Sequence, residues 1–541
     1  MFAFEAAHAG KYTLGIPRTL LASILGLALV ARLVGIGFGL PLANARPDET
    51  TIAGEAVQFL GGNFRPQMFI YPTFMMDVVA LIYMAYYLLG RPFTHYTTLT
   101  AFLESRRQDL APFLYLTRGL SAIMGTLTVW WVYEIARRVF DSTVALVAAL
   151  FLALSFLHVR DSHFGVTDVM MTALVVLAVL EIVQWHQTGE RRHAVMAGLV
   201  AGLATSTKYN GLGVAVPFAV AAALRIVGAR TRAAEVRCCL GAAVLFGALV
   251  AAGFFGPSPY ILIEWRRFLS DVGMQQATFV AGHGIPIARG WWYHASHTLP
   301  VALGWPVYLA SLAGVAGLLA IEFRRSAVIL SFPLTYYIVA GSGQTVFARY
   351  IIPVLPFLCM TAAWFVVTVV GKLTVQSAPP LRRVAIAVAG LLLVAPSARS
   401  VALMDRLLSR QDNRLVAGRA LEDLVPVGST LYQSSGPYGL PVPSRLAVHE
   451  WRYDETTGGF SPDGRLPDWI VLQRSPLALY SHVAPGLERL VREHYHLVAA
   501  FPADRGGAGR TYDQQDAFFL PLDHLEQIDR PGPSFEIYRR L

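Results

Sequence analysis

Apolar stretches long enough to cross a lipid bilayer recur along roughly the first 400 residues, and this repetition limits the fold more than any other feature. The chain of 541 residues is 55% hydrophobic and only 15% charged, with a mean hydropathy of +0.49. Soluble proteins of this length rarely have so apolar a composition. We therefore expect a polytopic α-helical membrane protein, and the span-length rule gives about eleven membrane spans.

The basic residues indicate how these spans are oriented. The formal net charge is +9, but Lys and Arg cluster in short loops between apolar runs, as they do in cytoplasmic loops, and so do not indicate a nucleic-acid partner. Lys11 and Arg18 precede the first apolar run, which predicts a cytoplasmic N-terminus. The loops that contain Arg138, Arg192 and Arg325 are then predicted to lie on the same side of the membrane.

The first apolar run, at about 17–40, resembles a signal peptide in one respect only. The small residues "LANA" before Arg46 are similar to a signal cleavage site. The run is too long for a typical signal peptide and contains Arg32. We therefore expect an uncleaved first membrane span.

Counting spans from this start places several polar segments on the outer side of the membrane. Asp48 and Glu49 emerge there first. The later outer segments are residues 158–168, 206–211, 256–298 and 341–350. Residues 194–227 begin and end inside, so they must make two crossings with a turn near Lys208. The segment 68–90 begins and ends outside, so we expect a juxtamembrane or interfacial helix there, although a crossing stays open.

The C-terminal part has a different composition, since the long apolar runs stop at about residue 400. We expect residues 1–399 to form a transmembrane catalytic domain and residues 400–541 a soluble extracytoplasmic α/β domain. Predicted elements are an amphipathic helix at 415–426, strands at 428–435, 467–475 and 534–541, and a helix followed by a strand at 482–501. The cysteines Cys238, Cys239 and Cys359 lie in apolar runs without disulfide or metal spacing.

The predicted outer segments carry most of the polar groups that are difficult to explain as solvated loop. Asp168 lies just inside an apolar run, and Lys208 lies between two such runs. Ionisable groups at membrane depth are costly, so they are usually paired or functional. Arg349 and Tyr350 close the set in "FARYIIPVLP".

Each of these residues also has a structural interpretation. Asp48 and Glu49 could place negative charge at a helix start, and Asp168 could be a helix N-cap. Lys208 could extend its ammonium to the lipid phosphates, and Arg349 could anchor the membrane edge. Together, however, the acids and bases suit group transfer from a lipid phosphate: cations bind the phosphate, and a carboxylate such as Asp48 removes a proton from a hydroxyl.

The order of motifs resembles family 39 of the GT-C membrane glycosyltransferases, which includes protein O-mannosyltransferases and the aminoarabinose transferase of lipid A. "RPDE" followed by "GGNFRPQMFIYPTF" is similar to the first outer loop of this family. "SFLHVRDSHFGVTDVMMT" looks like its second outer loop, and "GLATSTKYNG" and "FARYIIPVLP" also match. "DNRLVAGRALEDLVPVGSTLY" resembles the start of the extracytoplasmic domain that many members carry. The resemblance covers essentially the whole membrane part.

The resemblance implies transfer of a sugar from a polyprenyl-phosphate donor to a hydroxyl acceptor, with inversion at the anomeric carbon. It implies that Asp48 is the general base, that Glu49 orients or assists it, and that Asp168 positions the acceptor or the base. The resemblance also implies that Lys208 binds the donor phosphate, together with Arg349 and Tyr350. Candidate substrate-binding residues in the same segments are Tyr71, His163, Tyr209 and His283.

Other interpretations remain open at this point. A transporter or flippase of a polar lipid or solute would also be polytopic with intramembrane charges, although its polar groups would gather near mid-membrane. A non-catalytic assembly or receptor subunit would leave the acids and Lys208 unexplained. No cofactor is required, and a divalent metal beside Asp48 and Glu49 is compatible with the sequence. The expected partners are the donor lipid, a hydroxyl acceptor on a protein, lipid or glycan, and membrane lipids, and the expected location is a bacterial inner membrane.

Overall fold

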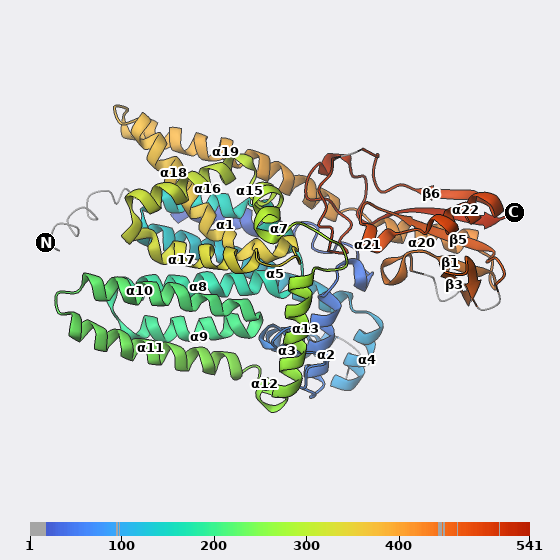
Figure 1. Cartoon of the computed structure of the whole chain (residues 1–541), viewed down its shortest axis with the longest axis horizontal. Coiled ribbons are helices and arrows are strands. Elements are labelled where there is room, and N and C mark those ends of the chain that lie inside the picture. The colour runs from blue at the N-terminus through green and yellow to red at the C-terminus, as the bar shows by residue number, and fades with distance from the viewer. Residues whose placement is uncertain are drawn as a thin grey trace.

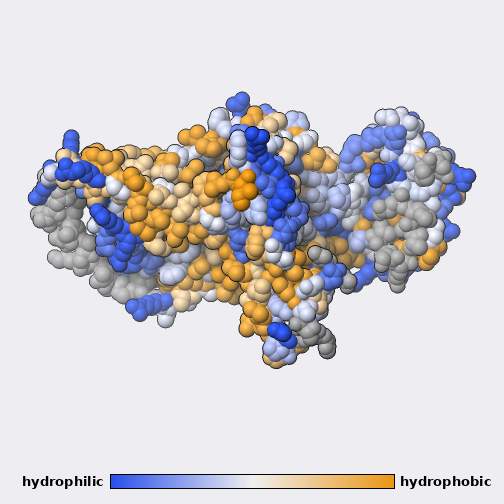
Figure 2. Space-filling view, turned by 90° about the horizontal axis from the view of Figure 1, so that it is seen from below, coloured by the Kyte–Doolittle hydropathy of each residue, from blue (hydrophilic) through white to orange (hydrophobic). Residues whose placement is uncertain are grey.

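A computed structural model describes residues 18–541 except 94, 95, 97, 442–445, 447, 448, 462, 463 and 508. Lys11, on which part of the orientation prediction depends, lies outside the described residues. The structure is elongated, with a helical bundle at one end and a smaller sheet-containing part at the other (Figure 1). A broad apolar surface covers the bundle, whereas the C-terminal part is mostly polar (Figure 2).

The bundle is built from long helices that run along its length. They are α1 (Arg18–Leu33), α5 (Ala111–Val139), α6 (Ser142–Ala153), α7 (Phe156–Ser162), α8 (Thr167–Thr188), α9 (Arg191–Thr207), α10 (Ala215–Gly228), α11 (Arg232–Phe255), α16 (Trp305–Ile321), α17 (Phe323–Ala340), α18 (Leu355–Leu373) and α19 (Pro379–Leu408). The 3₁₀ segments η3 (Tyr209–Val214) and η5 (Ala348–Val354) lead into α10 and α18. Helices α9 and α10 are therefore joined by a turn that contains Lys208, where the sequence predicts a turn, while the crossing of the membrane by both helices stays a prediction.

Further helices lie at the end of the bundle near the C-terminal part (Figure 1). They are α2 (Glu49–Leu60), α3 (Phe74–Gly90), α4 (Leu99–Gln108), α12 (Tyr260–Ile263), α13 (Trp265–Ala281), α14 (Gly290–Tyr293) and α15 (Leu299–Leu303). Single turns are η1 (Ala43–Ala45), η2 (Arg91–Phe93) and η4 (His294–Thr298), of which η4 is a π turn.

Among the described residues, six helices are long and apolar enough to cross a membrane, or up to eight if each of two bent pairs forms one span. The bent pairs are α6 with α7, at 58°, and the segment 290–303 with α16, at 117°. These numbers support a multi-pass membrane protein, while the count of about eleven stays a prediction. Helix α5 is not among these six, whereas residues Phe74–Phe93, which are α3 continued by η2 and overlap the predicted juxtamembrane segment, are one of them.

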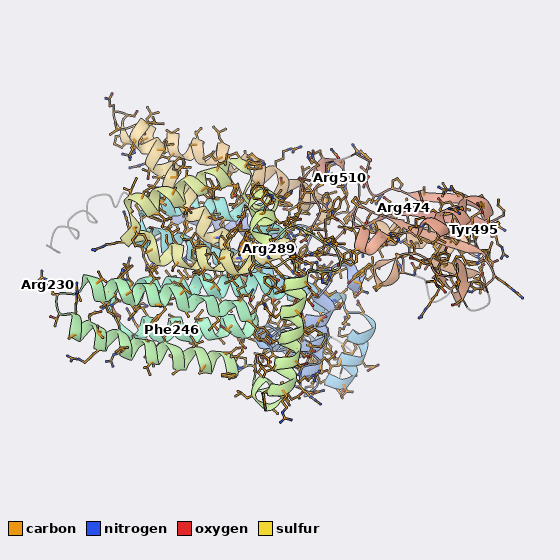
Figure 3. All side chains as sticks on the ribbon, in the orientation of Figure 1. Arg230, Phe246, Arg289, Arg474, Tyr495 and Arg510 are labelled. Atoms are coloured by element: carbon orange, nitrogen blue, oxygen red, sulfur yellow. The ribbon has the colours of Figure 1, made fainter. Side chains whose placement is uncertain are left out.

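Several arginines hold together the end of the bundle away from the C-terminal part, which we call the arginine end. Arg225 donates hydrogen bonds to the carbonyls of Trp185 and His186 at the end of α8. Arg325 donates to the carbonyls of Val139 and Phe140 at the end of α5. Arg230, in the α10–α11 loop, marks the same end in Figure 3. The loops predicted as cytoplasmic from their charge thus include four that lie together, namely the α5–α6, α8–α9, α10–α11 and α16–α17 loops.

A break between α6 and α7 directs the chain toward the opposite end. The break frees backbone carbonyls inside the bundle, where unpaired polar groups are costly. The buried Arg32 guanidinium donates to the carbonyls of Leu152 and Ala153. Ser397 donates to the carbonyl of Leu154 and accepts from the Phe156 amide. These side chains replace the lost helical hydrogen bonds and fix the direction of α7, which leads to the segment before Asp168.

The C-terminal part contains a five-stranded mixed sheet in the order β2-β1-β5-β7-β6. Its strands are β1 (Thr430–Gln433), β2 (His449–Glu450), β5 (Trp469–Arg474), β6 (Tyr495–Phe501) and β7 (Ser534–Arg540), and β3 (Arg452–Asp454) pairs with β4 (Gly459–Ser461). The associated helices are α20 (Asn413–Leu424), α21 (Ala478–Ser481) and α22 (Pro485–His494), with the 3₁₀ turns η6 (Gly436–Tyr438) and η7 (Leu525–Gln527).

Helices α20 and α22 and strands β1, β5, β6 and β7 lie in the segments where the sequence predicts them. The division into domains at 399/400 stays a prediction, and α19 continues through that position to Leu408. Between β6 and β7, residues 513–522 leave the sheet and pack against the bundle; we call this segment the strap. Phe518, Leu520 and Leu522 of the strap belong to the same apolar core as the bundle helices.

Candidate active site

Asp48 lies where the chain enters α2, with a backbone conformation that most residues avoid. Its φ of 70° makes it one of two described non-glycine residues with a positive φ. Asp48 occupies the N-cap position, but its side chain makes no capping hydrogen bond. Its carboxylate is about one-third exposed, at 32%. Asp48 and Glu49 therefore do place negative charge at the start of α2, but the Asp48 side chain does not cap the helix. Strained residues of this kind often occur at functional sites.

The Arg349 guanidinium connects three carboxylates from distant parts of the chain. Its Nη2 donates to Asp48 Oδ2 at 3.0 Å, and its Nη1 donates to Asp516 Oδ2 at 3.0 Å. Its Nε lies 4.0 Å from Asp168 Oδ2 and has no hydrogen-bond partner. Arg349 is held in this position by η5, which buries Ala348 before it and Ile351 and Ile352 after it. The side chain is therefore a central charge of the site rather than a membrane anchor.

Lys208 and Asp168 form a second ion pair beside Arg349. Lys208 Nζ donates to Asp168 Oδ1 at 2.6 Å, and it lies 4.9 Å from the centre of the Tyr350 ring. Asp168 lies in the first turn of α8, whose N-cap residue is Val166, so Asp168 is not the cap. The structure thus brings together Asp168, Lys208 and Tyr350, which the sequence separates by up to 182 positions (350 − 168 = 182).

Glu49 points away from this group although it follows Asp48 directly. Its carboxylate accepts hydrogen bonds from Arg118 Nε and Nη2, the shortest at 2.7 Å, and from the Gly165 amide at 2.8 Å. Both side chains of the Glu49–Arg118 pair are fully buried. Arg118 Nη1 also donates to the carbonyls of Ile36 and Phe38. These hydrogen bonds tie Glu49 to α5 and to the segment before α8, while its implied role of orienting or assisting Asp48 stays a prediction.

Gly165 makes this arrangement possible because its backbone passes very close to α5. A Cβ atom at position 165 would lie 2.8 Å from Thr117 Cγ2. A larger residue would push the loop away from α5 and from Glu49. Since Asp168 follows three residues later, the close approach also positions the acidic end of α8.

Asp516, which we did not predict from the sequence, completes the site from the strap. Its Oδ1 pairs with Arg46 and its Oδ2 pairs with Arg349, and the side chain is 2% exposed. Burial alone would raise the pKa of Asp516, but the charges of Arg46, Arg349 and Arg160 lower it to about 2. Asp516 is therefore an anion throughout the neutral pH range.

The remaining predicted residues divide into two groups. Tyr71 donates to Asp48 Oδ2 at 3.5 Å, and His283 contacts the Phe347 ring, which in turn lies 4.3 Å from the Arg349 guanidinium. Tyr209 donates to the Phe69 carbonyl and thereby ties the Lys208 turn to the first loop.

His163 does not join the site. It is fully buried, and its two ring nitrogens lie 3.0 and 2.9 Å from the carbonyls of Val159 and Val34. These contacts leave no ring nitrogen for a substrate, so the prediction of substrate binding by His163 is wrong. The sequence did not indicate that the segment 158–163 turns into the bundle as α7.

The geometry does not fit a metal ion bound between Asp48 and Glu49. Glu49 is already engaged by Arg118 and Gly165, and Asp48 faces a guanidinium. In the part of the chain that the structure describes, no group of three or more His, Cys, Asp or Glu side chains could hold a metal ion. That the chain requires no cofactor stays a prediction.

Comparison with known families identifies the class of this site. The family model described as dolichyl-phosphate-mannose-protein mannosyltransferase matches residues 116–254, which run from α5 to α11 and include Asp168 and Lys208. The predicted resemblance to family 39 is confirmed, and the match indicates a glycosyltransferase. No curated protein matches the chain.

Solved structures show a similar fold at low sequence identity. An oligosaccharyltransferase from Archaeoglobus fulgidus, tethered with an acceptor peptide, has 13% identity and a TM-score of 0.50, and covers 80% of this chain. The chain spans 64% of the length of that protein. ArnT from Cupriavidus metallidurans bound to undecaprenyl phosphate has 13% identity, a TM-score of 0.48, and coverage of 96% of this chain and 97% of its own. The likeness to the oligosaccharyltransferase shows the GT-C fold alone.

Proposed function

We propose that this chain transfers a sugar from a polyprenyl-phosphate donor to a hydroxyl group of an acceptor. The observation that carries the proposal is the partly exposed Asp48 carboxylate, held in a strained conformation beside Arg349, Lys208 and Asp168. In such a reaction the carboxylate can take the proton of the acceptor hydroxyl, and the two cations can stabilise the leaving phosphate. The family match and the dolichyl phosphate in its description support the donor class.

In the proposed reaction, Asp48 is the general base. Its carboxylate takes the proton of the acceptor hydroxyl while that oxygen forms a bond to the anomeric carbon. The bond from the anomeric carbon to the donor phosphate oxygen breaks on the opposite face, and the electron pair leaves with the phosphate. A single displacement of this kind inverts the anomeric centre. The leaving phosphate is already an anion, so cations rather than a general acid stabilise its departure.

Lys208 and Arg349 are the proposed phosphate ligands. Each is already paired with carboxylates, Lys208 with Asp168 and Arg349 with Asp48 and Asp516. Among the described residues, Lys208 Nζ donates a hydrogen bond to Asp168 alone although an ammonium has three donors, and Arg349 Nε donates none. Both cations therefore have donors left for phosphate oxygens, and the carboxylates keep them in place before the donor arrives.

We also propose that the site faces the extracytoplasmic side of a bacterial inner membrane, together with residues 400–541. The site lies at the end of the bundle opposite the arginine end, and arginine-rich loops are typical of the cytoplasmic side. The donor then enters from the lipid, and the acceptor is a hydroxyl of a protein, lipid or glycan.

The purified wild-type chain in detergent provides the test. Detergent removes the two compartments that transport requires, so only a transferase releases free polyprenyl phosphate from the donor. We expect release from an undecaprenyl-phosphate-linked hexose or pentose when a hydroxyl acceptor is added, with the sugar inverted in the product. Absence of release across a panel of such donors, together with movement of labelled lipid across vesicles, would favour the transporter instead.

A further inference from the structure

The strap is a fixed wall of the active site, not a loosely attached loop. The centre of the Phe518 ring lies 4.9 Å from the centre of the Phe164 ring and 5.9 Å from the centre of the Phe38 ring. Phe164 lies between α7 and α8, and Phe38 follows α1. Leu520 and Leu522 are buried in the same core. The apolar side chains of the strap therefore fix its position against the bundle.

Polar contacts attach the strap to the segment directly before Arg349. The amide of Ala348 donates to Asp513 Oδ2 at 2.8 Å, and the amide of Val346 donates to Gln515 Oε1 at 2.7 Å. Gln515 Nε2 donates in return to the Gln344 carbonyl at 3.1 Å. The strap and residues 344–348 thus form one hydrogen-bonded unit that carries both Asp516 and Arg349.

Asp516 shares the Arg349 guanidinium with Asp48. One Arg349 nitrogen binds Asp516 and the other binds Asp48, each at 3.0 Å, while the second oxygen of Asp516 binds Arg46. The result is a row of alternating charges, Arg46, Asp516, Arg349 and Asp48, that begins and ends in the first loop. Only Asp48 in this row is substantially exposed.

We propose that Asp516 is a positioning residue for the transfer reaction. It fixes the Arg349 guanidinium and thereby sets how strongly the charge of Arg349 attracts the Asp48 carboxylate. This inference rests on the proposed function and extends it to the C-terminal part of the chain. Asp516 does not reach the reacting atoms. It acts through Arg349, whose charge is divided between two carboxylates.

The sign of the effect follows from the charges around Asp48. Charged and titratable groups surround Asp48 on each neighbouring segment: Arg46 on its own loop, Tyr71 before α3, Asp168 on α8, Lys208 after α9, Arg349 and Tyr350 on η5, Tyr438 on η6, and Asp516 on the strap. Glu49, which follows Asp48, is turned toward Arg118 instead. When Asp516 loses its negative charge, less of the positive charge of Arg349 is neutralised. Arg349 then attracts the Asp48 carboxylate more strongly, and Asp48 binds a proton less tightly. Loss of the positive charge of Arg46 has the opposite effect.

Two variants with opposite expected shifts test the inference. We would measure kcat against pH with the undecaprenyl-phosphate-linked sugar that wild type turns over, and compare the acid limb, where activity falls because the base is protonated. Asp516→Asn should move the acid limb to lower pH by roughly 0.5–1 pH unit. It should also lower kcat about ten- to a hundredfold, because Arg349 loses its ion pair with Asp516 and is held less firmly. Arg46→Met should move the acid limb up by a similar amount.

Asp412→Asn is the matched control. Asp412 forms a buried ion pair with Arg414 at 2.8 Å, with both side chains 3% exposed, and Arg414 donates to the Asn44 carbonyl in the first loop. This variant should lose stability as Asp516→Asn does, without any shift of the acid limb. If Asp516→Asn does not fold, the upward shift of Arg46→Met still decides the question.

Three results would have different meanings. Opposite shifts for Asp516→Asn and Arg46→Met support the positioning role, because structural damage gives no such signs. An unchanged acid limb in both variants, with stability losses like that of Asp412→Asn, overturns it. If wild type itself turns over no donor, the proposed function fails, and this outcome is recognised before any variant is compared.

Discussion

The buried Glu49–Arg118 pair allows a stability prediction that also separates a structural from a catalytic role for Glu49. Glu49→Gln removes a charge that accepts three hydrogen bonds from Arg118 and one from the Gly165 amide. The Arg118 guanidinium would stay fully buried without its counter-charge. Breaking a buried pair in this way costs about 3–5 kcal/mol of unfolding free energy.

Glu134→Gln provides the matched control. Glu134 pairs with Arg137 at 2.8 Å and also with Arg138, but these arginines are 43% and 27% exposed, so loss of the pairs should cost only about 0–1 kcal/mol. Unfolding in mixed detergent micelles, followed by tryptophan fluorescence, gives the difference between the two variants. A cost for Glu49→Gln no larger than that for Glu134→Gln would refute the argument from burial.

Activity of the same variants tests the role of Glu49. If Glu49 only holds the first loop, Arg118→Met should reduce donor turnover about as much as Glu49→Gln, since both break the same pair. A large loss in Glu49→Gln with near-normal turnover in Arg118→Met would mean that Glu49 acts directly on the substrate.

Further predictions concern three residues of the site. Lys208→Met should raise the KM for the donor by roughly tenfold with a smaller change in kcat, measured as release of polyprenyl phosphate, because a charge-assisted contact to phosphate is lost. Asp48→Gly should be about 1–2 kcal/mol more stable than Asp48→Ala in the same unfolding assay, because only glycine adopts a φ of 70° without strain. Burial and the charge of Asp516 raise the pKa of Asp513 to about 7. An unfolded Asp titrates near 3.9, so the folded state keeps a proton that the unfolded state loses, and stability should fall as pH rises from about 4 to 7. Asp513→Asn should lack this slope in thermal unfolding at several pH values.

The sequence was sufficient to predict which segments between the apolar runs meet. Apolar run lengths and loop charges assign alternate loops to one side, and the structure brings Asp48, Asp168, Lys208 and Arg349 together at one end of the bundle. This prediction was possible because the membrane reduces the arrangement of long helices to two ends.

The contacts of individual side chains could not be predicted in the same way. Asp516 lies in a polar coil, 167 positions after Arg349 (516 − 349 = 167), and no periodicity or motif indicates that this coil returns to the bundle. One missed partner did have a signal: Arg118 lies within an apolar run, and a charge at that depth requires a counter-charge. Glu49 is that counter-charge, although the family resemblance implies a role for it in catalysis.

The central claim is that Asp48 takes the acceptor proton. Its most direct test is the rate of sugar transfer by the variant Asp48→Asn. An asparagine keeps the size of the side chain and tolerates the left-handed backbone conformation of position 48. Asp77→Asn is the control, since Asp77 accepts a hydrogen bond from Thr73 at 3.3 Å and has no contact with Arg349. We expect Asp48→Asn to lower kcat by about 10²–10⁴-fold, the usual contribution of a general base, with folded protein and donor binding retained. Asp77→Asn should keep kcat within a few-fold of wild type, and an Asp48→Asn enzyme that transfers sugar at the wild-type rate would contradict the account.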